Sequence, residues 1–157
     1  MDNKYYQPKI EEFCIGFEFE KYDERSATYK ENNFKPTNWH KFKYDLKSIR
    51  LSQLPVHLQE KKIRVKYLDQ QDIENLGWEH YGKAVCNWYK KEGMFDDGFA
   101  SYGKWTKLKL LHCSNSRIKI LAYEPSWGEI ETVLFAGECK NKSELKKLMQ
   151  QLNIKGN

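Results

Sequence analysis

The sequence has no long apolar run, no closely spaced pair of cysteines and no low-complexity tract. None of its hydrophobic stretches approaches the roughly 20 residues that cross a bilayer, and Met1 leads into polar sequence rather than a signal peptide. No stretch is rich in glycine, serine and proline in the manner of a linker between domains. We therefore expect a cytoplasmic protein without membrane contact that folds as a single domain over residues 1–157.

The four cysteines are scattered along the chain as Cys14, Cys86, Cys113 and Cys139. Zinc-binding cysteines usually occur as close pairs, and none of these four belongs to a CxxC motif. Without an export signal, reduced thiols are the expected state. The sequence therefore predicts four free thiols, no metal ion and no cofactor.

The chain is instead rich in aromatic residues (15%) and charged residues (31%), with a net charge of +5. The charge alternates in blocks, because residues 26–66 hold ten basic and three acidic residues, whereas residues 67–100 hold three basic and seven acidic ones. Such a dipolar surface is suited to nucleic acid on one side and to a basic protein groove on the other.

Hydrophobic periodicity predicts an α+β fold with one antiparallel β-sheet. The expected strands are residues 13–20, 39–46, 62–68, 78–88, 106–110, 117–121 and 130–136. A short middle helix is expected after Asp69, which suits an N-cap position, and a C-terminal amphipathic helix after Asn141, where Glu144 completes a capping box. The apolar stripe of the C-terminal helix is Leu145, Leu148, Met149 and Leu152.

Basic residues alternate with apolar residues along four of these strands. Because burial of the apolar positions in one core puts the basic side chains outside, we predict one phosphate-binding face, with Trp39 as a stacking partner for unpaired bases. The predicted cations are Lys41, Lys43, Lys62, Arg64, Lys66, Lys107, Lys109, Arg117 and Lys119. Lysine and arginine also protect solvent-facing strands from aggregation, so a merely solvated face remains the alternative.

A second predicted site is acidic and would dock on a basic protein surface. Its residues are Glu18, Glu20, Asp23 and Glu24. Two carboxylates on one strand face can also perform acid–base chemistry, which leaves a hydrolase that uses Glu18 and Glu20 as an alternative. The sequence shows no nucleophile with a base and a carboxylate at a recognisable spacing, so we predict no catalytic residues and no enzyme.

Three stretches of the sequence carry a family resemblance. They are YYQPKIEEF at 5–13 with GFE at 16–18, then RVKYLD at 64–69 with DIE at 72–74 and LGW at 76–78, and finally FAGECKNKSEL at 135–145. In these stretches the chain resembles a family of small uncharacterised proteins from phages and mobile elements of Bacteroidetes. The resemblance implies no catalytic residues. It implies a short accessory protein, expressed from mobile DNA inside a bacterial cell.

Accessory proteins of this kind are frequently counter-defence factors. The resemblance therefore implies a non-enzymatic, anti-CRISPR-type inhibitor that binds an RNA-guided nuclease or its guide RNA, with an RNA-targeting type VI effector as the candidate target. A general RNA- or DNA-binding accessory protein is the first alternative and the hydrolase is the second. The expected partners are thus a host nuclease or ribonucleoprotein, together with RNA.

Overall fold

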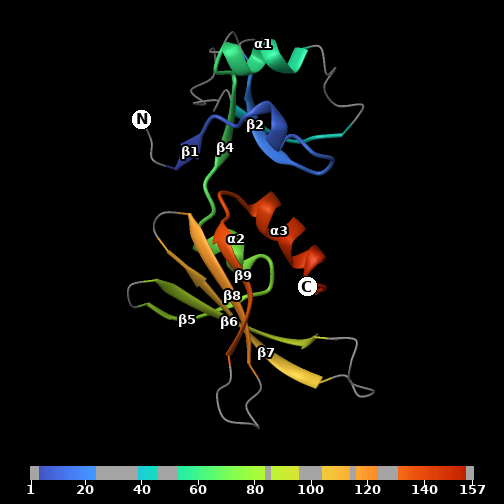
Figure 1. Cartoon of the computed structure of the whole chain (residues 1–157). Helices are drawn as coiled ribbons and strands as arrows, with labels where there is room; N and C mark the ends of the chain where they lie inside the picture. Colours follow the sequence, from blue (N-terminus) through green and yellow to red (C-terminus); the bar gives the residue numbers. More distant parts are fainter. Residues whose placement is uncertain are drawn as a thin grey trace. The chain divides into compact units, whose positions relative to one another are not determined.

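The computed structural model describes residues 4–23, 39–45, 53–83, 86–95, 104–113, 116–123 and 131–154. The chain divides into two compact units, residues 1–67 and residues 68–157 (Figure 1). Each unit has its own antiparallel sheet and its own hydrophobic core. The predicted α+β class is confirmed, but the strands form two sheets instead of one. That residues 1–157 form a single domain stays a prediction.

The N-terminal unit is a four-stranded sheet with two short helices. Its elements are β1 (Tyr5–Tyr6), the 3-10 helix η1 (Ile10–Glu12), β2 (Glu18–Tyr22), β3 (Trp39–Lys43), α1 (Leu54–Gln59) and β4 (Ile63–Lys66). The strand order is β1-β4-β2-β3, and every described pairing is antiparallel. The core of this unit contains Phe17, Phe19, Tyr44, Leu54, Ile63 and Val65.

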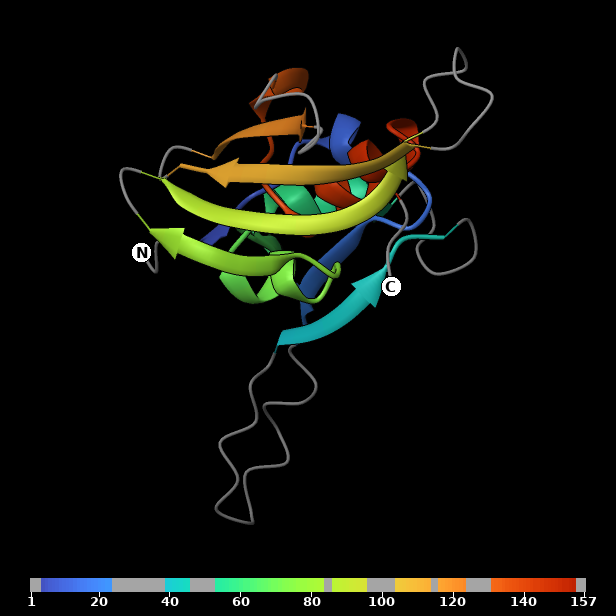
Figure 2. The ribbon, with the colours of Figure 1, turned by 90° about the horizontal axis from the view of Figure 1, so that it is seen from below.

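The C-terminal unit is a five-stranded meander with two helices. Its elements are α2 (Gln70–Glu74), β5 (Glu79–Lys83), β6 (Asn87–Phe95), β7 (Lys104–His112), β8 (Arg117–Tyr123), β9 (Glu131–Glu138) and α3 (Lys142–Gln151). The strands lie in the order β5-β6-β7-β8-β9, and Figure 2 shows them side by side in a curved sheet. None of the helices in the described ranges is long and apolar enough to cross a membrane.

Both helices of the C-terminal unit begin where the sequence predicts. The Asp69 side chain accepts a hydrogen bond from the Asp72 backbone N–H (3.0 Å), and the Asn141 side chain accepts one from the Glu144 N–H (3.0 Å). The Glu144 carboxylate in turn accepts a hydrogen bond from the Lys140 N–H. These bonds satisfy backbone donors that have no partner within the helix.

Helix α3 packs on one face of the five-stranded sheet. Its fully buried residues, Leu145 and Met149, belong to the same core as Tyr89, Leu110 and Ile120 of the strands, and Leu148 and Leu152 pack against this core. The predicted apolar stripe of the C-terminal helix is thereby confirmed. Because side chains alternate along a strand, the opposite face of the sheet, which we call the outer face, receives the intervening residues.

Two predicted strands are wrong in their extent. Gly16 adopts a left-handed conformation (φ 89°) that interrupts residues 13–20, so the strand begins only at Glu18 and Ile15 is 73% exposed. Residues 78–88 belong to two strands, β5 and β6, which form a hairpin. Helix α1 was not predicted, although Pro55 in its first turn is a favourable start for a helix.

The prediction of four free thiols is wrong for two of them. Cys86 and Cys113 form a disulfide between the residue that precedes β6 and the residue that follows β7, with a Cα–Cα distance of 4.6 Å. Antiparallel pairing sets this position, because Asn87 and His112 are direct cross-strand partners. Cys14 is free and exposed. Cys139 is free and buried, and burial raises the pKa of its thiol to about 12, so this thiol is unreactive.

The disulfide gives a testable prediction for stability. We expect the variant Cys86→Ser/Cys113→Ser to lose about 3 to 4 kcal/mol in free energy of unfolding, because the cross-link closes a loop with a sequence separation of 27. Urea denaturation under non-reducing conditions measures the loss, and Cys14→Ser serves as the control. Equal stability of the double variant and the parent would show that the two thiols are not paired in solution.

Candidate nucleic-acid interface

The four-stranded sheet places acidic residues directly opposite basic ones. Glu18 is the cross-strand partner of Lys43, while Glu20 lies between Lys41 on β3 and Arg64 on β4. Direct cross-strand partners point to the same face of a sheet, so the charges on this face balance one another. Lys62 forms an ion pair with Glu60 at 2.8 Å, and Lys66 is the cross-strand partner of Tyr5.

Arg64 is held from three sides. Its guanidinium lies 3.8 Å from the centre of the Tyr5 ring and 4.1 Å from that of the Trp39 ring. Its Nε and Nη2 both lie 2.8 Å from Oε2 of Glu20, whose side chain is only 15% exposed. A planar guanidinium can stack on rings and bind a carboxylate at the same time. Arg64 on β4 therefore connects Tyr5 of β1, Glu20 of β2 and Trp39 of β3 within the N-terminal unit. Trp39 stacks on this cation.

The nine predicted cations are divided between the two units: Lys41, Lys43, Lys62, Arg64 and Lys66 belong to the N-terminal unit, and Lys107, Lys109, Arg117 and Lys119 to the C-terminal sheet. The predicted acidic docking site is not a separate surface, because Glu18 and Glu20 face the cations of their own sheet. Asp23 follows β2 and is exposed, and Glu24 lies outside the described residues.

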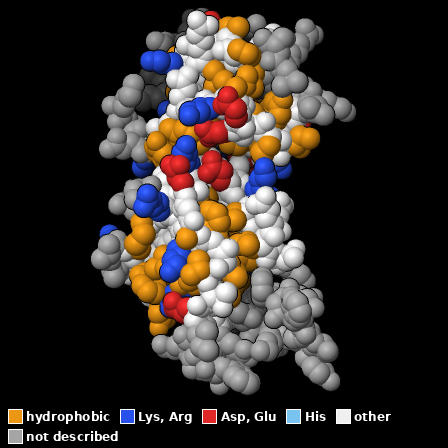
Figure 3. Space-filling model, in the orientation of Figure 1, with side chains coloured by type: hydrophobic (Ala, Val, Ile, Leu, Met, Phe, Trp, Pro, Cys, Tyr) orange, Lys and Arg blue, Asp and Glu red, His pale blue; other side chains and the backbone are white. Residues whose placement is uncertain are grey.

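The outer face of the five-stranded sheet combines lysines with aromatic rings. Lys90 on β6 is the direct partner of both Glu79 on β5 and Lys109 on β7. Lys107 and Glu131 are both direct partners of Tyr123 on β8. Figure 3 shows basic and hydrophobic side chains next to each other on this unit. Two lysines opposite each other repel, so carboxylates or phosphates nearby stabilise this face.

A cleft of about 600 Å³ opens among these side chains. The residues that line it from the outer face are Glu79, Tyr81, Trp88, Lys90, Lys107, Lys109, Tyr123 and Glu131, and Gly77, Tyr89 and Lys91 complete the lining. Tyr81 is 72% exposed. The volume lies within the range of small-molecule sites, so the cleft is large enough for an aromatic heterocycle.

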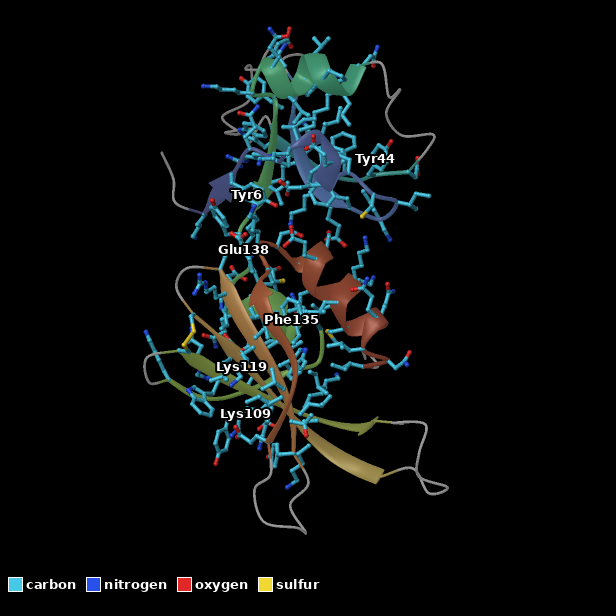
Figure 4. The ribbon with its side chains drawn as sticks, in the orientation of Figure 1. Tyr6, Tyr44, Lys109, Lys119, Phe135 and Glu138 are labelled. Carbon is cyan, nitrogen blue, oxygen red and sulfur yellow. A yellow bond between two sulfur atoms is a disulfide. The ribbon has the colours of Figure 1, made fainter. Side chains whose placement is uncertain are left out.

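Lys109, labelled in Figure 4, lines this cleft and contacts two of its aromatic rings. Its ammonium lies 4.8 Å from the Trp88 ring centre and 5.4 Å from the Tyr123 ring centre, and it donates a hydrogen bond to Oε1 of Glu131 at 2.7 Å. On the β5 side, Lys90 repeats the pattern more loosely, 5.3 Å from the Tyr81 ring and 3.4 Å from a Glu79 oxygen. Cation–π attraction holds both lysines over ring faces.

Two further cations continue the outer face along β8. Arg117 and Lys119 are exposed and line a second hollow of about 790 Å³ together with Glu138 of β9. Glu138 is the direct cross-strand partner of Arg117. Strand alternation places Arg117, Lys119 and Tyr123 on one face, so the cations extend from the cleft toward the disulfide.

The inner wall of the cleft includes two buried residues of β6, Lys91 and Tyr89. Lys91 is buried and donates hydrogen bonds to the backbone carbonyls of Leu76 and Gly77, where α2 ends. Burial lowers the pKa of this ammonium. Tyr89 is fully buried, and burial raises the pKa of its phenol to about 12. Both groups therefore anchor β6 beneath the cleft and do not face solvent.

Sequence reasoning identified Lys107, Lys109, Arg117 and Lys119 on this face but missed the aromatic half of the cleft. The sequence prediction treated residues 78–88 as one strand. It therefore did not show that Glu79 and Tyr81 share one face of β5, or that Trp88 and Lys90 share one face of β6. The signal was present as Trp88-Tyr89-Lys90-Lys91, in which two buried residues alternate with two cleft residues. Tyr123 continues the alternation of β8 by one further step.

Comparison of the chain with protein-family models, with curated proteins and with solved structures gave no match. The family resemblance therefore stays a prediction. Within the described ranges, no three histidine, cysteine, aspartate or glutamate side chains gather in a way that could hold a metal ion.

Mutation can distinguish a cation that stabilises the fold, such as Arg64, from an exposed one, such as Lys41. We expect Arg64→Ala to lower the free energy of unfolding by about 1 to 3 kcal/mol, because it leaves the mostly buried Glu20 carboxylate without its charged donor. Chemical denaturation measures this effect, with Lys41→Ala as the exposed control. A stability equal to that of the parent would mean that Arg64 is dispensable for the N-terminal unit.

Proposed function

We propose that the outer face of the five-stranded sheet binds single-stranded nucleic acid without performing chemistry on it. The observation that supports this most is the position of Lys109 between the Trp88 and Tyr123 rings, beside exposed lysines and within a cleft. Proteins that bind single strands combine a cationic groove for the backbone with aromatic rings for the bases. The N-terminal sheet has both residue types, but its Arg64 is held by two nitrogens at 2.8 Å from one Glu20 oxygen and by two rings.

Binding would rearrange the centre of the cleft. In the free protein, the Lys109 ammonium covers ring faces and neutralises Glu131. A phosphate oxygen is a better partner for an ammonium than a ring face, because the charge-assisted hydrogen bond is stronger. As Lys109 turns to the phosphate, the faces of Trp88 and Tyr123 become available for base stacking. The exposed Lys107 and Lys119 add phosphate contacts on either side.

The inhibitor of an RNA-guided nuclease is the more specific form of this proposal. It draws on the family resemblance, and the outer face supplies the contact that it needs, a surface for guide or target RNA. In this form the protein would bind a ribonucleoprotein and compete with the basic channel that holds the RNA. Binding to a ribonucleoprotein but not to bare RNA would favour this form over a general nucleic-acid-binding protein.

The phosphate contacts predict a defined dependence on salt. Each phosphate that a lysine neutralises on a single strand contributes roughly −0.7 to the slope of log affinity against log salt concentration. We expect Lys107→Gln/Lys119→Gln to reduce the magnitude of this slope by about 1.4. Fluorescence anisotropy with labelled single-stranded RNA and DNA measures it. The control Lys41→Gln/Lys43→Gln removes equal charge from the N-terminal sheet and should leave the slope unchanged; equal slopes for both variants would refute the proposed face.

The stacking contacts predict a loss that does not depend on salt. Tyr81→Ala removes an exposed ring from the cleft and should weaken binding by about 1 to 3 kcal/mol, with the slope preserved. Ile15→Ala, at a similarly exposed site in the N-terminal unit, is the matched control. Unchanged affinity of the Tyr81 variant at every salt concentration would show that the Tyr81 ring does not contact bases.

A further inference from the structure

The cleft also contains carboxylates, which neutralise its lysines in the free protein. Glu79 and Glu131 line it from the two opposite ends of the sheet, on β5 and β9. In the free protein these carboxylates pair with Lys109 and Lys90, but a lysine that turns to a phosphate leaves its carboxylate in need of another hydrogen-bond donor. The groups on a nucleic acid that can donate hydrogen bonds to it are the N–H groups of the bases and, in RNA, the 2′-hydroxyl, and only the bases differ between sequences.

Resting on the proposed function, we infer that Glu131 reads the stacked base and selects guanine. An ionised carboxylate only accepts hydrogen bonds. Guanine offers two adjacent donors on its pairing edge, N1–H and the N2 amino group, which match the two carboxylate oxygens. Adenine and cytosine each offer one amino group beside an acceptor nitrogen, and uracil and thymine offer one N–H between two carbonyl oxygens. The ligand class is therefore a single strand that presents unpaired guanine.

Glu131 is better placed for this role than Glu79. Its side chain is 41% exposed against 71% for Glu79, and Lys109 fixes Oε1 at 2.7 Å, whereas the contact of Lys90 with Glu79 is 3.4 Å. The same Lys109 ammonium lies near the Trp88 and Tyr123 rings, so Glu131 lies at the edge of the place where a base would stack. When Lys109 turns to a phosphate, the carboxylate loses its hydrogen-bond donor. A guanine edge replaces that donor.

The test compares (GU)5 with U10, both fluorescently labelled, by anisotropy in lithium buffer, which disfavours guanine quadruplexes. The parent should bind (GU)5 about tenfold more tightly or better, since a bidentate contact is worth about that factor. Glu131→Gln should bring the two affinities within about twofold while U10 binding stays equal or becomes tighter, because an amide cannot accept both hydrogen bonds. Glu79→Gln is the matched control and should retain the preference. Matching (GT)5 and T10 strands show whether DNA is read in the same way.

The outcomes separate this inference from the proposed function. Equal binding of (GU)5 and U10 by the parent overturns guanine selection but leaves nucleic-acid binding in place. A preference that survives in Glu131→Gln overturns the role of Glu131, and a preference lost only in Glu79→Gln moves that role to β5. Absence of binding to all four strands overturns both proposals. The glutamine still accepts a hydrogen bond from Lys109, so the fold and the ring geometry remain a fair comparison.

Discussion

The two-residue repeat of a β-strand decides where the charged side chains of this protein lie. In both sheets alternate residues of inner strands enter a hydrophobic core, for example Ile63 and Val65 on β4 and Leu108 and Leu110 on β7. The residues between them must then point outward, whatever their charge. Those residues include Arg64 and Lys66 in one sheet and Lys107 and Lys109 in the other, and cations on a sheet face require neutralising partners.

The two sheets meet this requirement in different ways. The N-terminal sheet places Glu18 and Glu20 on the strand between its basic neighbours, so neutralisation occurs within the fold. The C-terminal sheet has Glu79 on β5, Glu92 on β6, and Glu131 and Glu138 on β9, and the rings of Trp88 and Tyr123 lie near Lys109. Lys119 has Leu111 and Ala136 as its cross-strand partners, and Lys109 lies near two aromatic rings. These two features are the reason for assigning nucleic-acid binding to the second face.

Much of the fold could be predicted from local sequence. Most of the features that could not be predicted depend on which strands pair and in which register. The caps at Asp69 and Asn141 are encoded within four residues, and the structure contains both. The division into two sheets depends on which strands pair, and period-two alternation is the same for either arrangement. The disulfide depends on cross-strand register, because Cys86 and Cys113 are far apart in sequence. For the same reason the sequence identified the lysines of the cleft but not the rings opposite them.

Arg64 in the N-terminal sheet and Lys109 in the C-terminal sheet differ in how firmly their contacts hold them. This difference explains why the proposed ligand would bind to the C-terminal sheet. Arg64 stacks on two rings and directs two nitrogens to one carboxylate oxygen, so a ligand that captured it would have to break all of these contacts together. Lys109 has a single hydrogen bond and two longer ring contacts, on a flexible stem. It can therefore exchange the rings for a phosphate at small cost. That exchange exposes the faces of the aromatic rings and the Glu131 carboxylate together. Through Lys109, binding of the nucleic-acid phosphates and recognition of the base would therefore be coupled.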